Sequence, residues 1–383
     1  MQGKLYVVVG GQFGSEGKGA VAGRLAADLE NRSHTVVGVR VGGPNAGHTV
    51  LGHCPADCDE QDHQPTGTHP CGRHPWRLRQ VPVSAVTAPL SDLVIAEGSE
   101  IDPDVLVHEV RQLDSAGYKV TERLLIDATT TVIEPHHRQA ERLVLRDRIG
   151  STAKGIGAAR SARTLREAHL WGKVHSQYDL GCTYGTARML DGQLRSPNGA
   201  VVIEGTQGYG LGQHAGYYPF CTSGDCRATD FLAQAGVGLW PWRGSRIRVL
   251  VCMRPYPIRV AGSSGPLKGE TSWETLGLPQ ELTTVTQKVR RVGRWDAELA
   301  AEAFKANGAP SDSVLLAATM FDQIESEVAG SNATGSSIFP RLDVLSYTAR
   351  FKLARMAQDC LDSTVAYVGT GPDTAMVDER IYE

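Results

Sequence analysis

The chain has 383 residues, of which 41% are hydrophobic and 21% are charged, and its formal net charge at pH 7 is −3. This composition is typical of a globular protein with a large core; it excludes a disordered or fibrous chain and gives no reason to expect a nucleic-acid or membrane partner. We expect a cytoplasmic protein, because no apolar run could span a bilayer, no signal-peptide pattern begins the chain, and the eight cysteines do not form a secreted disulfide framework.

The first predicted elements are a buried strand over residues 5–9, a glycine-rich loop, and a helix that begins at Ala20. This order points backbone N–H groups and a helix N-terminus toward a phosphate, and Lys18 would add a positive charge. The loop departs from the standard P-loop at Gln12, where that pattern has glycine, and at Gly19, where it has a hydroxyl residue. An ordinary turn between a strand and a helix therefore remains an alternative.

A second strand, predicted over residues 36–41, leads into the sequence Pro-Asn-Ala-Gly-His-Thr at residues 44–49. Because both glycine-containing loops follow strands, we expect them to meet in a crevice at the carboxyl edge of a sheet. His48 lies in the second loop, and this position favours a catalytic role over a structural one.

Residues 53–75 form a polar, proline-rich segment without hydrophobic periodicity. The spacings Cys54-x₃-Cys58 and Cys71-x₂-His74 match two half-sites of a tetrahedral zinc centre. The sequence therefore predicts a structural Zn²⁺ ion held by these four residues. The alternative is an exposed loop whose cysteines bind nothing.

Strand and helix patterns alternate through the rest of the chain, with strands expected over 93–96, 124–126, 201–204 and 315–320 and a helix over 103–116. This alternation predicts an α/β fold with a large, mostly parallel central sheet and flanking helices. We find no linker or internal repeat, so we expect a single domain over residues 1–383.

Another glycine-rich loop, at residues 150–157, is followed by Arg160, Arg163 and Arg166. A spacing of three residues brings these arginines near one helical face. Such a face would suit a phosphate group, and the alternative is a solvated basic surface.

Taken in order, the motifs resemble the adenylosuccinate synthetase family nearly from end to end. In that family the first loop ends Gly-Asp-Glu-Gly-Lys-Gly, and this chain has Gly-Ser-Glu-Gly-Lys-Gly at residues 14–19. The family's second loop, Asn-Ala-Gly-His-Thr, is present unchanged at residues 45–49. The resemblance implies the P-loop-type fold of this family, in which the Cys/His-rich segment at 53–75 is an insertion.

Four later segments continue the resemblance. Glu-Gly-Thr-Gln-Gly at 204–208 and Tyr-Pro-Phe-Cys-Thr-Ser at 218–223 are similar to nucleotide-binding segments of the family. The basic run at 281–291 is similar to its aspartate loop, and Gly-Thr-Gly-Pro-Asp at 369–373 is similar to its C-terminal motif.

Ser15 stands where the family has its loop aspartate, and this replacement resembles a phage branch that makes 2-amino-2′-deoxyadenylosuccinate from dGMP. The resemblance implies a ligase that joins dGMP to L-aspartate through a 6-phosphoryl purine and works in the cytoplasm, that of the host if the chain is phage-encoded. A hydroxyl is a weak base and a weak Mg²⁺ ligand, so the replacement argues against ordinary IMP chemistry. Two alternatives stay open: a synthetase that uses IMP and GTP, and a nucleotide-binding regulator without catalysis.

The phosphoryl donor is also inferred from a departure. The family has Thr-Lys-Leu-Asp where this chain has Thr-Met-Phe-Asp at residues 319–322. In the family this lysine covers the guanine ring. Met320 stands in its place and offers an uncharged surface, whereas Asp322 is retained. With the phage-branch resemblance, this favours ATP or dATP over GTP.

The resemblance finally implies which residues form the site. The triphosphate would contact Gly14, Ser15, Glu16, Gly17, Lys18, Gly19, Gly47, His48, Thr49, Asp322, Gly369, Gly371 and Pro372. The purine nucleotide would contact Ser15, Asn45, Ala46, Thr152, Arg166, Gln207, Thr222 and Lys288. L-Aspartate would contact Thr284, Val285, Thr286, Lys288 and Arg290. Ser15 and Gly47 would hold Mg²⁺, and Ser15, His48 and Gln207 would take part in catalysis. Arg166 would reach the nucleotide of a second subunit, which implies a homodimer.

Overall fold

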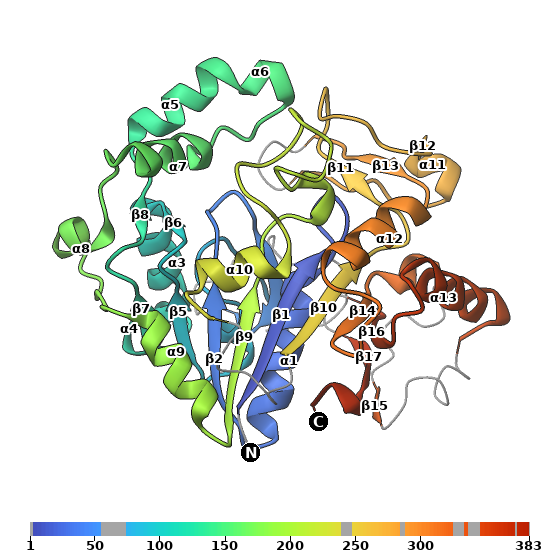
Figure 1. The fold of residues 1–383 in the computed structure, drawn as a ribbon, viewed down its shortest axis with the longest axis horizontal. Coiled ribbons are helices and arrows are strands. Elements are labelled where there is room, and N and C mark those ends of the chain that lie inside the picture. The colour runs from blue at the N-terminus through green and yellow to red at the C-terminus, as the bar shows by residue number, and fades with distance from the viewer. Residues whose placement is uncertain are drawn as a thin grey trace.

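The computed structural model describes residues 3–54, 74–238, 247–283, 288–324, 333–335, 345–371 and 374–382. Its main feature is a ten-stranded sheet in which all neighbouring strands run parallel except β16 and β17 (Figure 1). Across the sheet the strands are β15 (Ala333–Gly335), β17 (Ala375–Asp378), β16 (Val365–Gly369), β14 (Val314–Ala318), β10 (Ile247–Met253), β1 (Lys4–Gly10), β9 (Gly199–Glu204), β2 (Thr35–Arg40), β5 (Asp92–Ile95) and β7 (Leu124–Ile126). The predicted α/β fold with a mostly parallel central sheet is confirmed.

Both faces of the sheet are covered, because alternate residues of each strand point to opposite sides. Leu5, Val7 and Val9 of β1 belong to one apolar cluster, whereas Tyr6 and Val8 belong to the other. Helices α9 (Thr186–Arg195), α10 (Ala228–Gln234), α12 (Ala297–Ala306) and α13 (Tyr347–Asp359) pack into the first cluster. Helices α1 (Lys18–Asn31) and α3 (Pro103–Ser115) pack into the second. The protein is therefore a three-layer α/β/α arrangement.

Shorter elements surround these layers. The remaining helices are α2 (Ser84–Thr87), α4 (Val120–Arg123), α5 (Pro135–Val144), α6 (Arg146–Ile149), α7 (Ile156–Leu165), α8 (Trp171–Val174) and α11 (Trp273–Leu276). Three small sheets pair β3 (His48–Gly52) with β4 (His74–Leu78), β6 (Glu100–Ile101) with β8 (Thr131–Val132), and β13 (Arg291–Gly293) with both β11 (Ile258–Arg259) and β12 (Glu270–Thr271). None of the helices in the described ranges is long and apolar enough to cross a membrane.

The predicted boundaries differ from the observed ones by a few residues. Helix α1 begins at Lys18 instead of Ala20, directly after Gly17 in a left-handed conformation. Strand β14 ends at Ala318, two residues earlier than predicted, and Met320 beyond it has a φ angle of 54°. A residue with positive φ cannot continue a strand, so the chain turns there.

The topology brings several loops to one edge of the sheet. β1 lies between β9 and β10, and the three strands run in the same direction. The segments that follow β1, β2, β9, β10 and β14 therefore all leave the sheet at its carboxyl edge. This is where ligands bind in open parallel sheets, and it is the edge at which the sequence predicted a crevice.

Candidate active site

The loop between β1 and α1 is closed by its own glutamate. Oε1 of the buried Glu16 accepts hydrogen bonds from the backbone N–H groups of Gly14 (2.7 Å) and Gln12 (3.1 Å). Oε2 of Glu16 lies 2.5 Å from Nζ of Lys18, which is also buried. These contacts fix Lys18 at the first turn of α1. An ammonium group has three N–H donors, so Lys18 can bind Glu16 and still donate to a phosphate.

Ser15 is the exposed residue of this loop. Its φ angle is 57°, and the neighbouring Gly14 and Gly17 have φ angles of 87° and 73°. Glycine adopts positive φ without steric cost, whereas a serine there is held by its surroundings. The loop thus presents the Ser15 hydroxyl to solvent at the carboxyl edge of the sheet.

The second predicted loop lies directly against the first. A Cβ atom at Gly19 would lie 2.7 Å from Cβ of His48, so only glycine allows the first turn of α1 to approach β3 this closely. Asn45 lies in the same loop, and its Oδ1 accepts a hydrogen bond of 3.1 Å from Nε2 of Gln207. The structure therefore brings together four residues that the sequence placed in one site.

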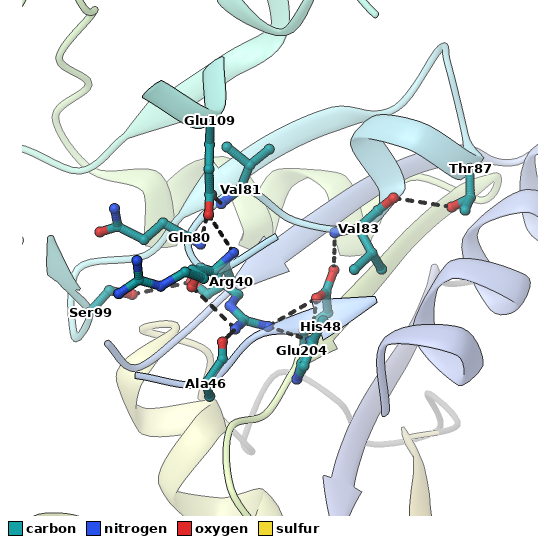
Figure 2. A network of polar contacts seen from close by, with 11 residues as sticks. Arg40, Ala46, His48, Gln80, Val81, Val83, Thr87, Ser99, Glu109 and Glu204 are labelled. Atoms are coloured by element: carbon teal, nitrogen blue, oxygen red, sulfur yellow. Dashed lines mark hydrogen bonds and ion pairs between the residues drawn. The ribbon is translucent and has the colours of Figure 1, made fainter. Parts of the chain in front are cut away.

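His48 belongs to a buried network of charged groups (Figure 2). Arg40 and Glu204 are the last residues of β2 and β9, and they pair directly across the sheet. Oε2 of Glu204 lies 3.2 Å from Nη1 of Arg40 and 3.0 Å from Nδ1 of His48, and Arg40 Nη1 also contacts Nδ1. Oε1 of Glu204 accepts the backbone N–H of Val83 at 2.6 Å. Because Nδ1 is engaged, Nε2 is the ring atom available to a ligand; it is buried and has no partner within the described part of the chain.

The network shifts the ionisation of its members. Burial, followed by the nearby charges of Arg40 and Lys18, lowers the pKa of His48 well below its usual 6.5. His48 is therefore neutral at pH 7. Burial raises the pKa of Glu204 to about 7, although Arg40 and the Val83 N–H oppose this shift.

Two further nucleotide candidates, Thr152 and Thr222, lie in neighbouring segments. Thr152 is exposed, and Thr222 donates its backbone N–H to the carbonyl of Leu211 at 2.7 Å. The two segments are neighbours, because a Cβ atom at Gly157 would lie 3.4 Å from Cβ of Ser223. The glycine-rich loop around Thr152 and the segment around Thr222 thus lie side by side.

The backbone amides at the N-terminus of α7 are already bound within the protein, although a glycine-rich loop precedes this helix. The carboxylate of Glu141 accepts the backbone N–H groups of Gly155 (2.8 Å), Gly157 (2.6 Å) and Ala158 (3.3 Å). A carboxylate at a helix N-terminus satisfies donors that lack a partner within the helix. This loop is therefore closed by a side chain of the protein itself.

The three arginines after this loop do not act as one phosphate-binding face. Arg160 donates from Nε to Glu100 at 2.6 Å, and Arg163 donates to the backbone carbonyl of Thr129. Arg166 is exposed and follows α7 in a left-handed conformation, with a φ angle of 67°. Of the three, Arg166 is the one whose exposure and position past the helix end fit a contact beyond its own helix.

The predicted triphosphate-binding segments lie at adjoining strand ends. Oγ1 of Thr319 donates to the backbone carbonyl of Glu16 at 2.9 Å, which ties the end of β14 to the first loop. A Cβ atom at Gly369 would lie 3.3 Å from Cα of Thr319, so the C-terminal motif borders the same point. Asp322 follows within a short 3₁₀ turn, Phe321–Gln323. Two further residues of the C-terminal motif were predicted to bind the triphosphate. Gly371 is among the described residues, whereas Pro372 lies outside them.

The described parts of the predicted aspartate loop, residues 281–283 and 288–290, pair antiparallel as the two sides of a hairpin. The backbone N–H of Arg290 donates to the carbonyl of Glu281 at 2.8 Å, and that of Thr283 donates to Lys288 at 2.9 Å. Lys288 is exposed and Arg290 is partly buried. Three further residues that were assigned to this loop, Thr284, Val285 and Thr286, lie outside the described residues.

The zinc prediction also falls mostly outside the described residues. Cys58 and Cys71 lie there, while Cys54 and His74 lie at the base of the β3–β4 hairpin, where Gly52 pairs with His74. Zinc binding therefore stays a prediction.

Among the described ranges, one group of potential metal ligands stands together, formed by Glu134, His136 and His137. However, Nδ1 of His137 accepts the backbone N–H of Glu134 at 3.1 Å, which occupies its lone pair. The other ring nitrogen of neutral His137 then carries the proton. This cluster is a poor metal site.

Three buried charged residues of the site have no role in the sequence-based predictions: Arg40, Glu204 and Arg254. Arg40 is the last residue of β2 and Arg254 directly follows β10, and both strands are otherwise largely apolar and buried. A charge at such a position requires a partner, and this was the signal that could have identified both. Glu204 was noted only as part of a motif.

Comparison with known proteins agrees with this geometry. The family model described as "Adenylosuccinate synthetase" matches residues 7–187 and 180–326. A protein named adenylosuccinate synthetase from Pyrococcus sp. (strain ST700) is 31% identical over 386 residues, which covers 98% of each chain. Its namesake from Thermococcus onnurineus (strain NA1) is 33% identical over 387 residues, again with 98% of each covered.

Two solved structures are similar over nearly the whole chain. The first is described as cyanophage S-2L succinoaminodeoxyadenylate synthetase (PurZ) bound to dGMP and to dATP as an energy donor. It is 27% identical with a TM-score of 0.74 and covers 100% of this chain and 99% of its own. The second is fully ligated adenylosuccinate synthetase from Plasmodium falciparum. This structure is 18% identical with a TM-score of 0.73, and the match covers 98% of this chain and 100% of its own. The similarity shows a shared fold.

Replacing Glu204 by glutamine tests the buried network. Activity of the wild-type protein should fall as the pH drops through about 7, because protonation of Glu204 removes the negative charge that balances Arg40 beside His48. In Glu204→Gln this pH-dependent limb should disappear, and kcat/KM at pH 8 should fall about tenfold or more. Glu100→Gln is the matched control, since Glu100 is also buried and paired with an arginine, Arg160. A pH profile that is the same in wild type and Glu204→Gln would contradict this assignment.

Proposed function

The chain belongs to the adenylosuccinate synthetase family, and we propose that it joins dGMP to L-aspartate to form 2-amino-2′-deoxyadenylosuccinate, with ATP or dATP as the phosphoryl donor. The chain is thus a C–N bond-forming ligase, and its choice of substrates is the proposal. The observation that carries the proposal is Ser15, which replaces the family's loop aspartate while the other motifs are retained. The similar cyanophage protein, whose structure is described as bound to dGMP and dATP, supports it.

The first half of the reaction makes C6 of the purine reactive. N1 gives up its proton to a base as O6 attacks the γ-phosphorus of the donor, the bond from that phosphorus to the β–γ bridging oxygen breaks, and a nucleoside diphosphate leaves. Phosphoryl transfer depends mainly on positioning and on neutralising charge. Lys18 supplies positive charge. In the tautomer in which Nδ1 of His48 accepts from Arg40, the Nε2–H can donate to a phosphate oxygen.

In the second half the amino group of aspartate attacks C6. The bond between C6 and O6 breaks, inorganic phosphate leaves with that oxygen, and the attacking nitrogen releases a proton. A dicarboxylate is best recognised by cationic side chains, which Lys288 and Arg290 provide on the hairpin. Lys288 keeps the charge of the family's arginine but loses its planar fork.

Ser15 changes the surroundings of N1. In the family the loop aspartate takes the proton from N1 and ligates Mg²⁺, and a serine hydroxyl does neither well. The shorter side chain leaves space beside N1, where guanine carries its 2-amino group. A carboxylate can also accept hydrogen bonds from guanine, so the preference for dGMP rests on the phage-branch resemblance together with this space.

Mg²⁺ is the metal that the family uses, and Ser15 and Gly47 are the residues that would hold it. Both are exposed, and they offer a hydroxyl and a backbone carbonyl oxygen. Mg²⁺ prefers oxygen ligands and usually takes several from substrate phosphates and water, so this partial set fits. When bound, the ion would neutralise charge on the phosphates of the donor.

A substrate screen tests the proposal. With aspartate, Mg²⁺ and ATP or dATP, dGMP should give 2-amino-2′-deoxyadenylosuccinate with a kcat/KM at least about tenfold above that of IMP. IMP is the specific competitor, because the similar archaeal proteins are named adenylosuccinate synthetase. Turnover of IMP without turnover of dGMP would refute the proposal, and absence of any aspartate-dependent turnover would favour the regulator.

Ser15 variants, assayed alongside that screen, show whether the serine determines the preference. Ser15→Asp restores the family residue and should shift the ratio of kcat/KM values toward IMP. Ser33→Asp is the matched control, because Ser33 is also exposed and also has a positive φ angle, 64°, but follows the far end of α1.

The donor preference can be tested at fixed dGMP and aspartate. ATP or dATP should give the higher kcat/KM, because Met320 lacks the charge of the family's lysine. Met320→Lys should raise the kcat/KM of GTP relative to ATP by about tenfold, while Met320→Leu, which keeps an apolar side chain, should not. A wild-type kcat/KM markedly higher with GTP than with ATP and dATP would contradict this preference.

We also propose that the protein is a homodimer in which Arg166 enters the neighbour's active site. Mixing His48→Asn with Arg166→Ala protein should recover activity, because one site of each mixed dimer has neither substitution. Recovery should reach about a quarter of the wild-type activity, since half of the dimers are mixed and one of their two sites is intact. No recovery from two folded, subunit-exchanging variants would contradict the shared site.

A further inference from the structure

Arg254 is a buried cation that follows β10 at the carboxyl edge of the sheet. Its side chain is 0% exposed. Gln12 holds its backbone from both sides, since the N–H of Arg254 donates to Gln12 Oε1 at 3.0 Å and its carbonyl accepts from Gln12 Nε2 at 2.9 Å. The position of the backbone is therefore fixed independently of the guanidinium group.

The guanidinium group joins three segments that are distant in the sequence. Both terminal nitrogens of Arg254 bind the carboxylate of Glu281. Nη1 donates to Oε2 at 3.1 Å, and Nη2 donates to Oε1. Nη1 also donates to the backbone carbonyl of Ser15 at 3.2 Å, and Nη2 lies 3.4 Å from Oε1 of Gln323. Gln323 in turn donates to Glu281 Oε1 at 3.2 Å.

Each of these segments carries a predicted ligand contact. Ser15 lies in the phosphate loop, and Gln323 follows Asp322 in the segment expected to bind the donor base. Glu281 forms the base of the hairpin that carries Lys288 and Arg290. Among the described residues, Arg254 is thus a common partner of the phosphate loop, the donor-base segment and the aspartate hairpin.

We propose that Arg254 is a positioning residue that holds the aspartate hairpin in register with the phosphate loop. The geometry favours a specific arrangement, because a planar guanidinium group fixes both the distance and the direction of a carboxylate. Although burial opposes ionisation, the Arg254 guanidinium keeps the pKa of Glu281 below its usual value, so the Glu281 carboxyl is ionised at neutral pH. The inference rests on the proposed function only for the identity of the ligand that the hairpin binds.

Amide hydrogen exchange on the ligand-free protein tests the positioning without any substrate. In Arg254→Met the amides of Thr283 and Arg290, which are hydrogen-bonded across the hairpin, should exchange about tenfold faster or more. Arg254→Lys, which keeps the charge but loses the fork, should show a smaller effect in the same direction. Arg123→Met is the matched control, because Arg123 also donates from both terminal nitrogens, to backbone carbonyls that include those of Ser91 and Tyr118. Arg123 is the last residue of α4 and makes none of the contacts of the site.

The KM values for aspartate and for the purine nucleotide provide a second test of the positioning. They are measured with the purine nucleotide that the enzyme turns over. Arg254→Met should raise the KM for aspartate about tenfold or more, with a smaller change in the KM of the purine nucleotide. Arg254→Met combined with Glu281→Met should cost less than the two single effects added together, because they remove one shared interaction.

The outcomes separate this inference from the proposed function. Faster exchange in the hairpin together with a raised KM for aspartate supports the inference, even if IMP replaces dGMP as the substrate. If the enzyme has no aspartate-dependent turnover, the proposed function fails, and the exchange result still decides on the positioning. Unchanged exchange at Thr283 and Arg290, or an equal change there in Arg123→Met, would overturn it.

Discussion

Buried ion pairs at the carboxyl ends of the central strands fix the geometry on which the site depends. Glu16 and Lys18 follow β1, and Arg40 and Glu204 end β2 and β9 side by side. A charge removed from water is tolerated only with a close, well-oriented partner, so each pair permits one arrangement of its loop. The parallel sheet brings these ends together, and the ion pairs then set the positions of individual atoms.

The protein uses its own carboxylates to close loops that resemble anion sites. Glu16 takes two amides of the first loop, and Glu141 takes three at the start of α7. The two loops nevertheless differ in what remains available. The first keeps Lys18 and the exposed Ser15, whereas the amides at the second are bound by a side chain. A glycine-rich sequence before a helix therefore does not by itself define a phosphate site.

His48 shows how burial and pairing combine to prepare one atom for chemistry. Glu204 and Arg40 engage Nδ1, and the burial that makes their charges costly also keeps the imidazole neutral. Nε2 is left without a competing partner in the described residues. The arrangement orients a neutral donor or acceptor beside Lys18, which suits a reaction in which charge moves between phosphate oxygens.

The sequence by itself determined the α/β class, the two loops at strand ends and the residues within them, because apolar periodicity and glycine position are local properties of the chain. It placed Asn45 and Gln207 in one site through family resemblance, and the structure shows them hydrogen-bonded. Only the tertiary structure decided what Arg40 and Arg254 do and how Arg160 is used. Their partners, Glu204, Glu281 and Glu100, lie far away in the sequence, and no local pattern specifies which buried charges will meet when the sheet assembles.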